Sequence, residues 1–78
     1  MSSSRVPTLD LRGTPCPLNY VKTRLELERM GHGAVLEVWV DRGEPESQVP
    51  RSLRMDGHFV ELLSVPAEYA RLRVVRRG

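Results

Sequence analysis

The sequence predicts a two-layer α/β (α+β) sandwich, in which two helices pack on one face of a four-stranded mixed sheet. Strand-like and helix-like stretches alternate along the chain in the order βαβαββ, and glycines separate them. The 78 residues suffice for one domain with a single thin core. We expect residues 1–7 to be a disordered tail and residues 8–78 to form that domain.

The first half of the chain predicts a strand, a helix and a second strand. Residues 8–12 alternate apolar and polar side chains, the period of a half-buried strand. Residues 17–30 are rich in good helix formers, and Gly31 is the expected C′ residue. Two apolar stripes on this helix are wider than one packed face needs, so part is expected to meet a partner. The stripes are Leu18, Val21 and Leu25, and Tyr20, Leu27 and Met30.

Residues 34–40 give the clearest strand pattern, since six of these seven residues are apolar and several are β-branched. The side chains expected to face the helices are Ala34, Leu36, Val38 and Val40, whereas Val35 and Trp39 face the other way. A loop is predicted over residues 41–46.

The second half of the chain predicts a shorter helix and a terminal pair of strands. Residues 47–56 form this helix, with Ser47 as N-cap, Pro50 in the first turn and Gly57 at the end. Residues 58–65 and 72–76 are predicted strands, joined by a connection over residues 66–69.

Cys16 is the one cysteine of the chain, and it lies between Pro15 and Pro17 where the first strand gives way to the first helix. Proline on its C-terminal side favours an extended Cys16, the conformation of an N-cap, and Pro17 suits the first helical position. Free N–H groups and the helix dipole favour an anion there, and the thiolate is the nucleophilic form of cysteine. The alternative is a small, packed cysteine without chemistry.

Composition excludes several classes of protein. One cysteine cannot form an internal disulfide, and no apolar run suits a signal peptide or a membrane span, so we expect a cytoplasmic protein with no membrane association. The formal net charge is only +2, and the basic cluster at the C-terminus lacks interleaved aromatic residues apart from Tyr69. Direct nucleic-acid binding is therefore not expected. That cluster is Arg71, Arg73, Arg76 and Arg77.

An ordered series of short motifs resembles the TusA/SirA family of small sulfur-carrier proteins. The series is Leu9-Asp10-Leu11-Arg12-Gly13, Cys16-Pro17, Gly31-His32-Gly33, a strand ending in Asp41, Val49-Pro50 and Gly57-His58. The resemblance spans residues 8–76. It implies a fold like the C-terminal domain of translation initiation factor three.

The resemblance also implies a sulfurtransferase-type role for Cys16. This residue would accept sulfane sulfur as a persulfide, from a cysteine desulfurase or a similar donor, and transfer it to an acceptor protein. Transfer RNA thiolation, molybdenum-cofactor maturation and general sulfur trafficking would all use this chemistry. No cofactor is implied, and a monomer suits a shuttle.

The sequence departs from the family motif Cys-Pro-x-Pro, because Asn19 replaces the second proline and Gln48 replaces an acidic residue. We hypothesise that Asn19 restores a backbone N–H aimed at the sulfur. Pro17 and Leu18 complete the motif beside Cys16.

Basic residues near the cysteine in the sequence are candidates for a supporting role. Arg12 is expected to steer the donor or to help hold the thiolate, and Lys22 and Arg24 are candidate partner contacts.

Two other classes of function stay open at this point. One is an RNA-binding or regulatory module that uses the fold surface and the arginine-rich C-terminal strand, and the other is an interaction protein with a structural Cys16. A metal site of Cys16, His32 and His58 is not expected, because the spacing fits no zinc pattern.

Overall fold

A computed structural model describes residues 6–64 and 68–77 and confirms the predicted βαβαββ order. Its elements are β1 (Thr8–Asp10), α1 (Leu18–Glu28), β2 (Val35–Asp41), α2 (Glu44–Met55), β3 (Phe59–Ser64) and β4 (Tyr69–Val75). Most of the predicted tail and half of the predicted 66–69 connection lie outside the described residues. Tyr69, predicted to belong to this connection, is the first residue of β4, so the last strand begins earlier than the predicted residue 72. Neither α1 nor α2, the helices of the described part, is long and apolar enough to cross a membrane.

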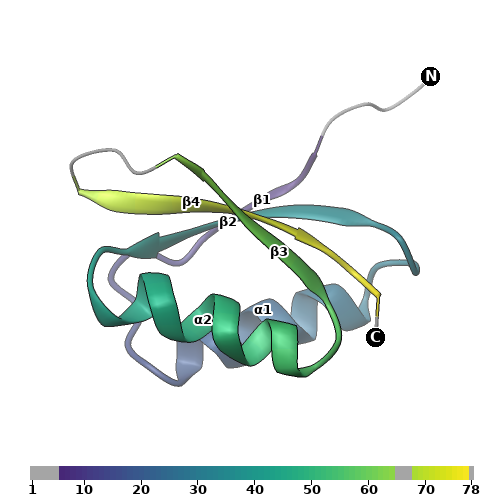
Figure 1. Cartoon of the computed structure of the whole chain (residues 1–78), viewed down its shortest axis with the longest axis horizontal. Coiled ribbons are helices and arrows are strands. Elements are labelled where there is room, and N and C mark those ends of the chain that lie inside the picture. The colour runs from purple at the N-terminus through teal and green to yellow at the C-terminus, as the bar shows by residue number, and fades with distance from the viewer. Residues whose placement is uncertain (1–5, 65–67, 78) are drawn as a thin grey trace.

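The four strands form one mixed sheet in the order β1-β2-β4-β3. β1 pairs with β2 in parallel, whereas β4 lies antiparallel to both β2 and β3. Both helices lie on the same face of this sheet (Figure 1). The two-layer sandwich expected from the sequence is therefore confirmed.

The core lies between the sheet and the helices and is built from small aliphatic side chains. β2 contributes Leu36, Val38 and Val40, as its period-two pattern predicts. α2 contributes Val49 and Leu53 at helical spacing. The remaining buried apolar residues are Leu11, Leu27, Val60, Ala70, Leu72 and Val74.

Helix α1 turns an unusual set of side chains toward the core. Its buried residues are Asn19, Thr23 and Leu27, which follow one another at four-residue spacing. The Thr23 hydroxyl donates to the Asn19 carbonyl oxygen at 2.9 Å, so its burial leaves no unpaired hydroxyl. The apolar stripe of Leu18, Val21 and Leu25 is 37–54% exposed, so it is the part of the helix left available to a partner.

Helix α2 begins at Glu44, so the prediction of Ser47 as N-cap is wrong. Gly43 is the N-cap, and its N–H donates to the Glu46 carboxylate at 2.7 Å. This bond gives the Gly43 N–H, at the start of the helix, a hydrogen-bond partner. Pro45 fits the first turn because the N–H it lacks has no partner there, and Pro50 consequently lies inside the helix.

The two helices end differently. In α2, the Gly57 and His58 N–H groups donate to the Arg54 and Leu53 carbonyl oxygens at 2.9 and 3.1 Å, a Schellman arrangement with Gly57 at φ +96° as predicted. α1 ends at Glu28 with Arg29 as C-cap, so Gly31 is not its C′ residue.

Truncating Leu27 tests whether α1 depends on its one core leucine. Leu27 is fully buried, so Leu27→Ala should lower the free energy of unfolding by about 2–5 kcal/mol through lost burial and a cavity. Leu25→Ala, on the same helix at a 54% exposed position, should cost less than about 1 kcal/mol. Urea unfolding measures both, and equal losses would contradict the assigned faces of α1.

Candidate functional site

Cys16 is exposed on the loop between β1 and α1. Pro17 is the N-cap of α1 and Leu18 is its first residue, one position later than the sequence predicts. The Cys16–Pro17 peptide bond is cis. The cysteine therefore directly precedes the cap of α1, and its side chain is open to solvent.

The thiol of Cys16 makes a hydrogen bond with the side chain of Asn19. Sγ lies 3.4 Å from Asn19 Oδ1, and the same oxygen accepts the Tyr20 backbone N–H at 2.7 Å. The Tyr20 bond fixes which end of the amide faces the sulfur. Asn19 is fully buried, and its Nδ2 has no hydrogen-bond partner within the described residues.

The hypothesis that the Asn19 backbone N–H faces the sulfur is wrong. That N–H donates to the Pro15 carbonyl oxygen at 3.1 Å, because the loop turns back on itself before α1 begins. The Tyr20 N–H is also occupied. Asn19 thus offers the sulfur an acceptor oxygen, and its own backbone donor closes the loop.

A cavity of about 230 Å³ lies beside Cys16, between α1 and α2. α2 lines it with Gln48, Val49 and Ser52, and the other side is formed by Cys16, Pro17 and Tyr20. These α2 residues were not predicted as site residues, since sequence periodicity identifies the faces of each helix but not how two helices meet. Their three- and four-residue spacing on α2 is the one signal that groups them.

The Tyr20 hydroxyl at the wall of this cavity donates to the Asp56 carboxylate. The hydrogen bond to Asp56 raises the pKa of Tyr20, and partial burial acts in the same direction. This bond joins α1 to the residue that caps the end of α2.

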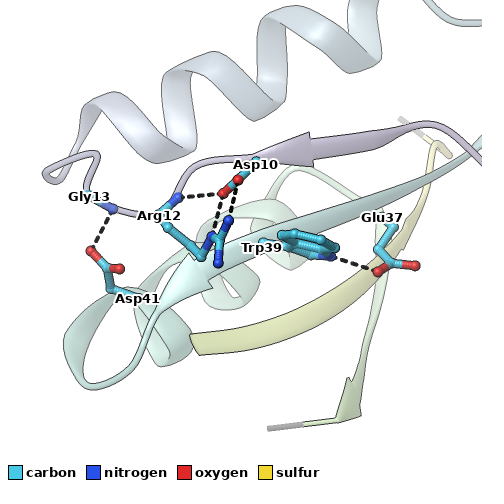
Figure 2. Close-up of polar contacts among 6 residues, drawn as sticks. All are labelled: Asp10, Arg12, Gly13, Glu37, Trp39 and Asp41. Atoms are coloured by element: carbon cyan, nitrogen blue, oxygen red, sulfur yellow. Dashed lines mark hydrogen bonds and ion pairs between the residues drawn. The ribbon is translucent and has the colours of Figure 1, made fainter. Parts of the chain in front are cut away.

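The loop that carries Cys16 is fastened to the end of β2. The Gly13 N–H donates to Asp41 Oδ2 at 2.9 Å, as Figure 2 shows. The Leu11 N–H donates to the Trp39 carbonyl oxygen at 2.9 Å, which extends the pairing of β1 beyond its last residue. Gly13 has φ +81°, a conformation that L-residues rarely adopt. Gly13 and Asp41, both part of the family motifs, therefore act together to hold the cysteine loop against β2.

The expected role of Arg12 in holding the thiolate is not supported by its contacts. Its guanidinium bonds the Asp10 carboxylate at 2.8 and 2.9 Å and lies 5.0 Å from the ring centroid of Trp39 (Figure 2). It also lies 4.8 Å from the ring centroid of Tyr69. These hydrogen bonds from Arg12 hold the pKa of Asp10 below its usual value. Arg12 is engaged in a cation–π and ion-pair cluster with β1, β2 and β4.

A family model described as Sulfurtransferase TusA matches residues 7–76. The chain belongs to the TusA family. Among the described residues of this family member, no group of three His, Cys, Asp or Glu side chains is placed to hold a metal ion.

Two curated relatives carry the printed name "Putative sulfur carrier protein". The one from Archaeoglobus fulgidus is 44% identical over 57 residues, which cover 73% of this chain and 62% of the relative. The one from Thermotoga maritima is 40% identical over 53 residues, covering 68% of this chain and 67% of the relative. The chain thus spans less than two thirds of the first relative's length.

A solved structure confirms the fold. The crystal structure of a SirA-like protein from Desulfitobacterium hafniense matches with a TM-score of 0.80 at 22% identity, over 94% of this chain and 100% of that chain. The family model confirms the resemblance to the TusA/SirA family inferred from the motifs, and the SirA-like structure confirms the fold.

The other predicted site residues of this TusA-family chain lie on the outer side of α1. Leu18 is 48% exposed at its start, and Lys22 is exposed one turn later. Arg24 is paired with Glu28 at 3.2 Å, an exposed i,i+4 ion pair. Their role as partner contacts stays a prediction.

Charged residues on the open face of the sheet are paired across strands. Glu37 accepts from Trp39 Nε1 at 2.7 Å and from Arg71 Nε at 2.8 Å. The Arg71 hydrogen bond, followed by that of Trp39, holds the pKa of Glu37 below its ordinary value of 4.5. Arg73 Nη1 lies 3.7 Å from Glu61 Oε1, an ion pair between β4 and β3. Two of the four clustered arginines are thereby offset by carboxylates of neighbouring strands.

Removing the Asp41 carboxylate tests the attachment of the cysteine loop. Asp41→Ala should lower the free energy of unfolding by about 1 kcal/mol and speed hydrogen exchange at the Gly13 amide, since this N–H loses its acceptor. Asp41→Asn keeps an acceptor oxygen and should retain most of the protection. Unchanged Gly13 exchange in Asp41→Ala would contradict the attachment.

The Glu37 network predicts a dependence of stability on pH. A carboxylate with a lowered pKa in the folded state stabilises the fold above its unfolded pKa and loses this contribution as pH falls through the folded pKa. Below about pH 4.5, Glu37→Gln should therefore lose less stability than the wild type. Urea midpoints at neutral and acidic pH measure this. Arg71→Met should flatten the profile too, and two unchanged profiles would contradict the network.

Proposed function

We propose that this TusA-family protein carries sulfane sulfur as a persulfide on Cys16, between a donor such as a cysteine desulfurase and an acceptor protein. The observation that carries the proposal is the exposed Cys16 at the start of α1, in a chain that the TusA model matches over residues 7–76. Its curated relatives are named as sulfur carriers, which supports the same role.

The transfer is a thiol–persulfide exchange. The Cys16 thiolate attacks the outer sulfur of a donor persulfide, so that a new S–S bond forms at Cys16 and the donor S–S bond breaks. The inner sulfur of the donor leaves as a thiolate, and the Cys16 sulfur takes over its oxidation level. The acceptor then attacks the outer sulfur and restores the Cys16 thiolate.

The surroundings of Cys16 suit a carrier that relies on its partners for catalysis. The thiol is bonded to an amide oxygen, Asn19 Oδ1, and this oxygen cannot take up its proton as a base would. Proton transfer therefore falls to the donor and acceptor enzymes. Exposure of the sulfur on the loop before α1 leaves it accessible to their active sites.

Loading by a desulfurase tests this role. Wild-type protein and Cys16→Ser are incubated with a cysteine desulfurase and cysteine, and their intact masses are measured with and without reductant. The wild type should gain the mass of one sulfur that reductant removes, and Cys16→Ser should gain none.

The second stage asks whether this sulfur moves on. Protein loaded with radiolabelled sulfur and freed of donor should pass the label to a candidate acceptor protein. A wild type that gains no sulfur contradicts the proposal, and salt-dependent RNA retention in its place would favour the nucleic-acid class.

A further inference from the structure

We propose that the cavity between α1 and α2 seats the outer sulfur of the Cys16 persulfide, with Gln48 and Ser52 as the residues that hold it. This inference rests on the proposed function and adds a binding site to it. The cavity begins at Cys16 itself, and both named side chains line its α2 wall.

The size of the cavity fits this use. Its volume is about 230 Å³, against roughly 30 Å³ for one water molecule in the liquid. One added sulfur atom therefore leaves room for the tip of an attacking side chain from a partner. Pro17 and Val49 give the cavity an apolar wall that shields part of the persulfide from water.

The lining also fits the charge of a persulfide. The outer S–H is more acidic than a thiol, so this sulfur is an anion near neutral pH and needs hydrogen-bond donors. Among the described residues, no carboxylate lines the cavity, and its lining residues with polar side chains besides Cys16 are Gln48, Ser52 and Tyr20. The Tyr20 hydroxyl already donates its proton to Asp56. Gln48 and Ser52 are therefore the residues that can donate hydrogen bonds to the outer sulfur.

Gln48 is available to turn toward such an anion. Its Nε2 lies 3.5 Å from Glu44 Oε2, at the limit of a hydrogen bond, so this contact restrains the amide weakly. A hydrogen bond to an ionised sulfur would be stronger.

The contact with Asn19 explains why the Cys16 side chain would turn away from Asn19 once it carries a second sulfur. In the thiol, the Cys16 proton lies between Sγ and Asn19 Oδ1 at 3.4 Å. A persulfide has no proton on Sγ, so lone pairs on sulfur and oxygen face each other and the attraction is lost.

Chemical loading tests the cavity without any partner protein. Wild type, Gln48→Met and Ser52→Ala are loaded with inorganic polysulfide, freed of excess reagent and checked for one added sulfur by intact mass. Cyanide then attacks the outer sulfur, giving thiocyanate and the Cys16 thiolate, and the rate of thiocyanate release is measured. Each variant should release sulfur about tenfold faster, the effect of losing one hydrogen bond to a charged group.

Two controls separate this role from a merely structural one. Ser47→Ala removes a hydroxyl of α2 that lies outside the cavity and contacts the Glu44 carbonyl, so its release rate should match the wild type. Alkylation of the resting thiol should be equal in all four proteins, because that thiol bonds to Asn19. A structural disturbance would change alkylation and sulfur release together.

The outcomes distinguish the two proposals. If polysulfide loads the wild type and the variants lose sulfur faster as expected, the cavity is supported, even where a desulfurase fails to load Cys16 and the relay is contradicted. Wild-type release rates in both variants would overturn the cavity. So would parallel changes in alkylation, or a wild type that polysulfide cannot load.

Discussion

The hydrogen bond between the Gly13 N–H and the Asp41 carboxylate fastens the cysteine loop to the sheet. β1 has only three residues and pairs with β2 alone, so it provides little hold by itself. The bond fixes the loop to the far end of β2, where the Leu11 N–H also pairs. An exposed sulfur thereby sits on a defined support, as the proposed role of a carrier between two partners requires.

Helix α1 divides its surface between two tasks. Two of the three buried residues on its inner face are polar, Asn19 and Thr23. Their side chains hydrogen-bond to the helix backbone and to the Cys16 thiol. Its outer face keeps an apolar stripe that begins next to Cys16. α1 therefore contributes only one apolar side chain, Leu27, to the core, and it supplies several residues of the site. α2 supplies both core residues and the opposite wall of the cavity.

Sequence reasoning succeeded where a short-range rule applies. Alternation in β2 predicted its buried face, and Gly57 predicted the end of α2. Pro17 located the start of α1 to within one position, since Pro17 and not Cys16 is the N-cap. It failed where the partner is distant or unexpected. A glycine N-cap served by Glu46 moved the start of α2, and the contact of Arg12 with Tyr69 depends on how β1 and β4 flank β2. The burial of Asn19 was also missed, since a polar amide normally indicates exposure and here only its Oδ1 has hydrogen-bond partners among the described residues.

Trp39 is the one tryptophan of the sequence, and it lies on the sheet face away from the helices, against Arg12 and Tyr69. The fluorescence of its ring therefore reports on the segment around Arg12 that leads into the cysteine loop. The aliphatic side chains of the core do not fluoresce. Indole emission reports on the environment of this ring, including the guanidinium beside it, whereas far-UV circular dichroism follows the helices.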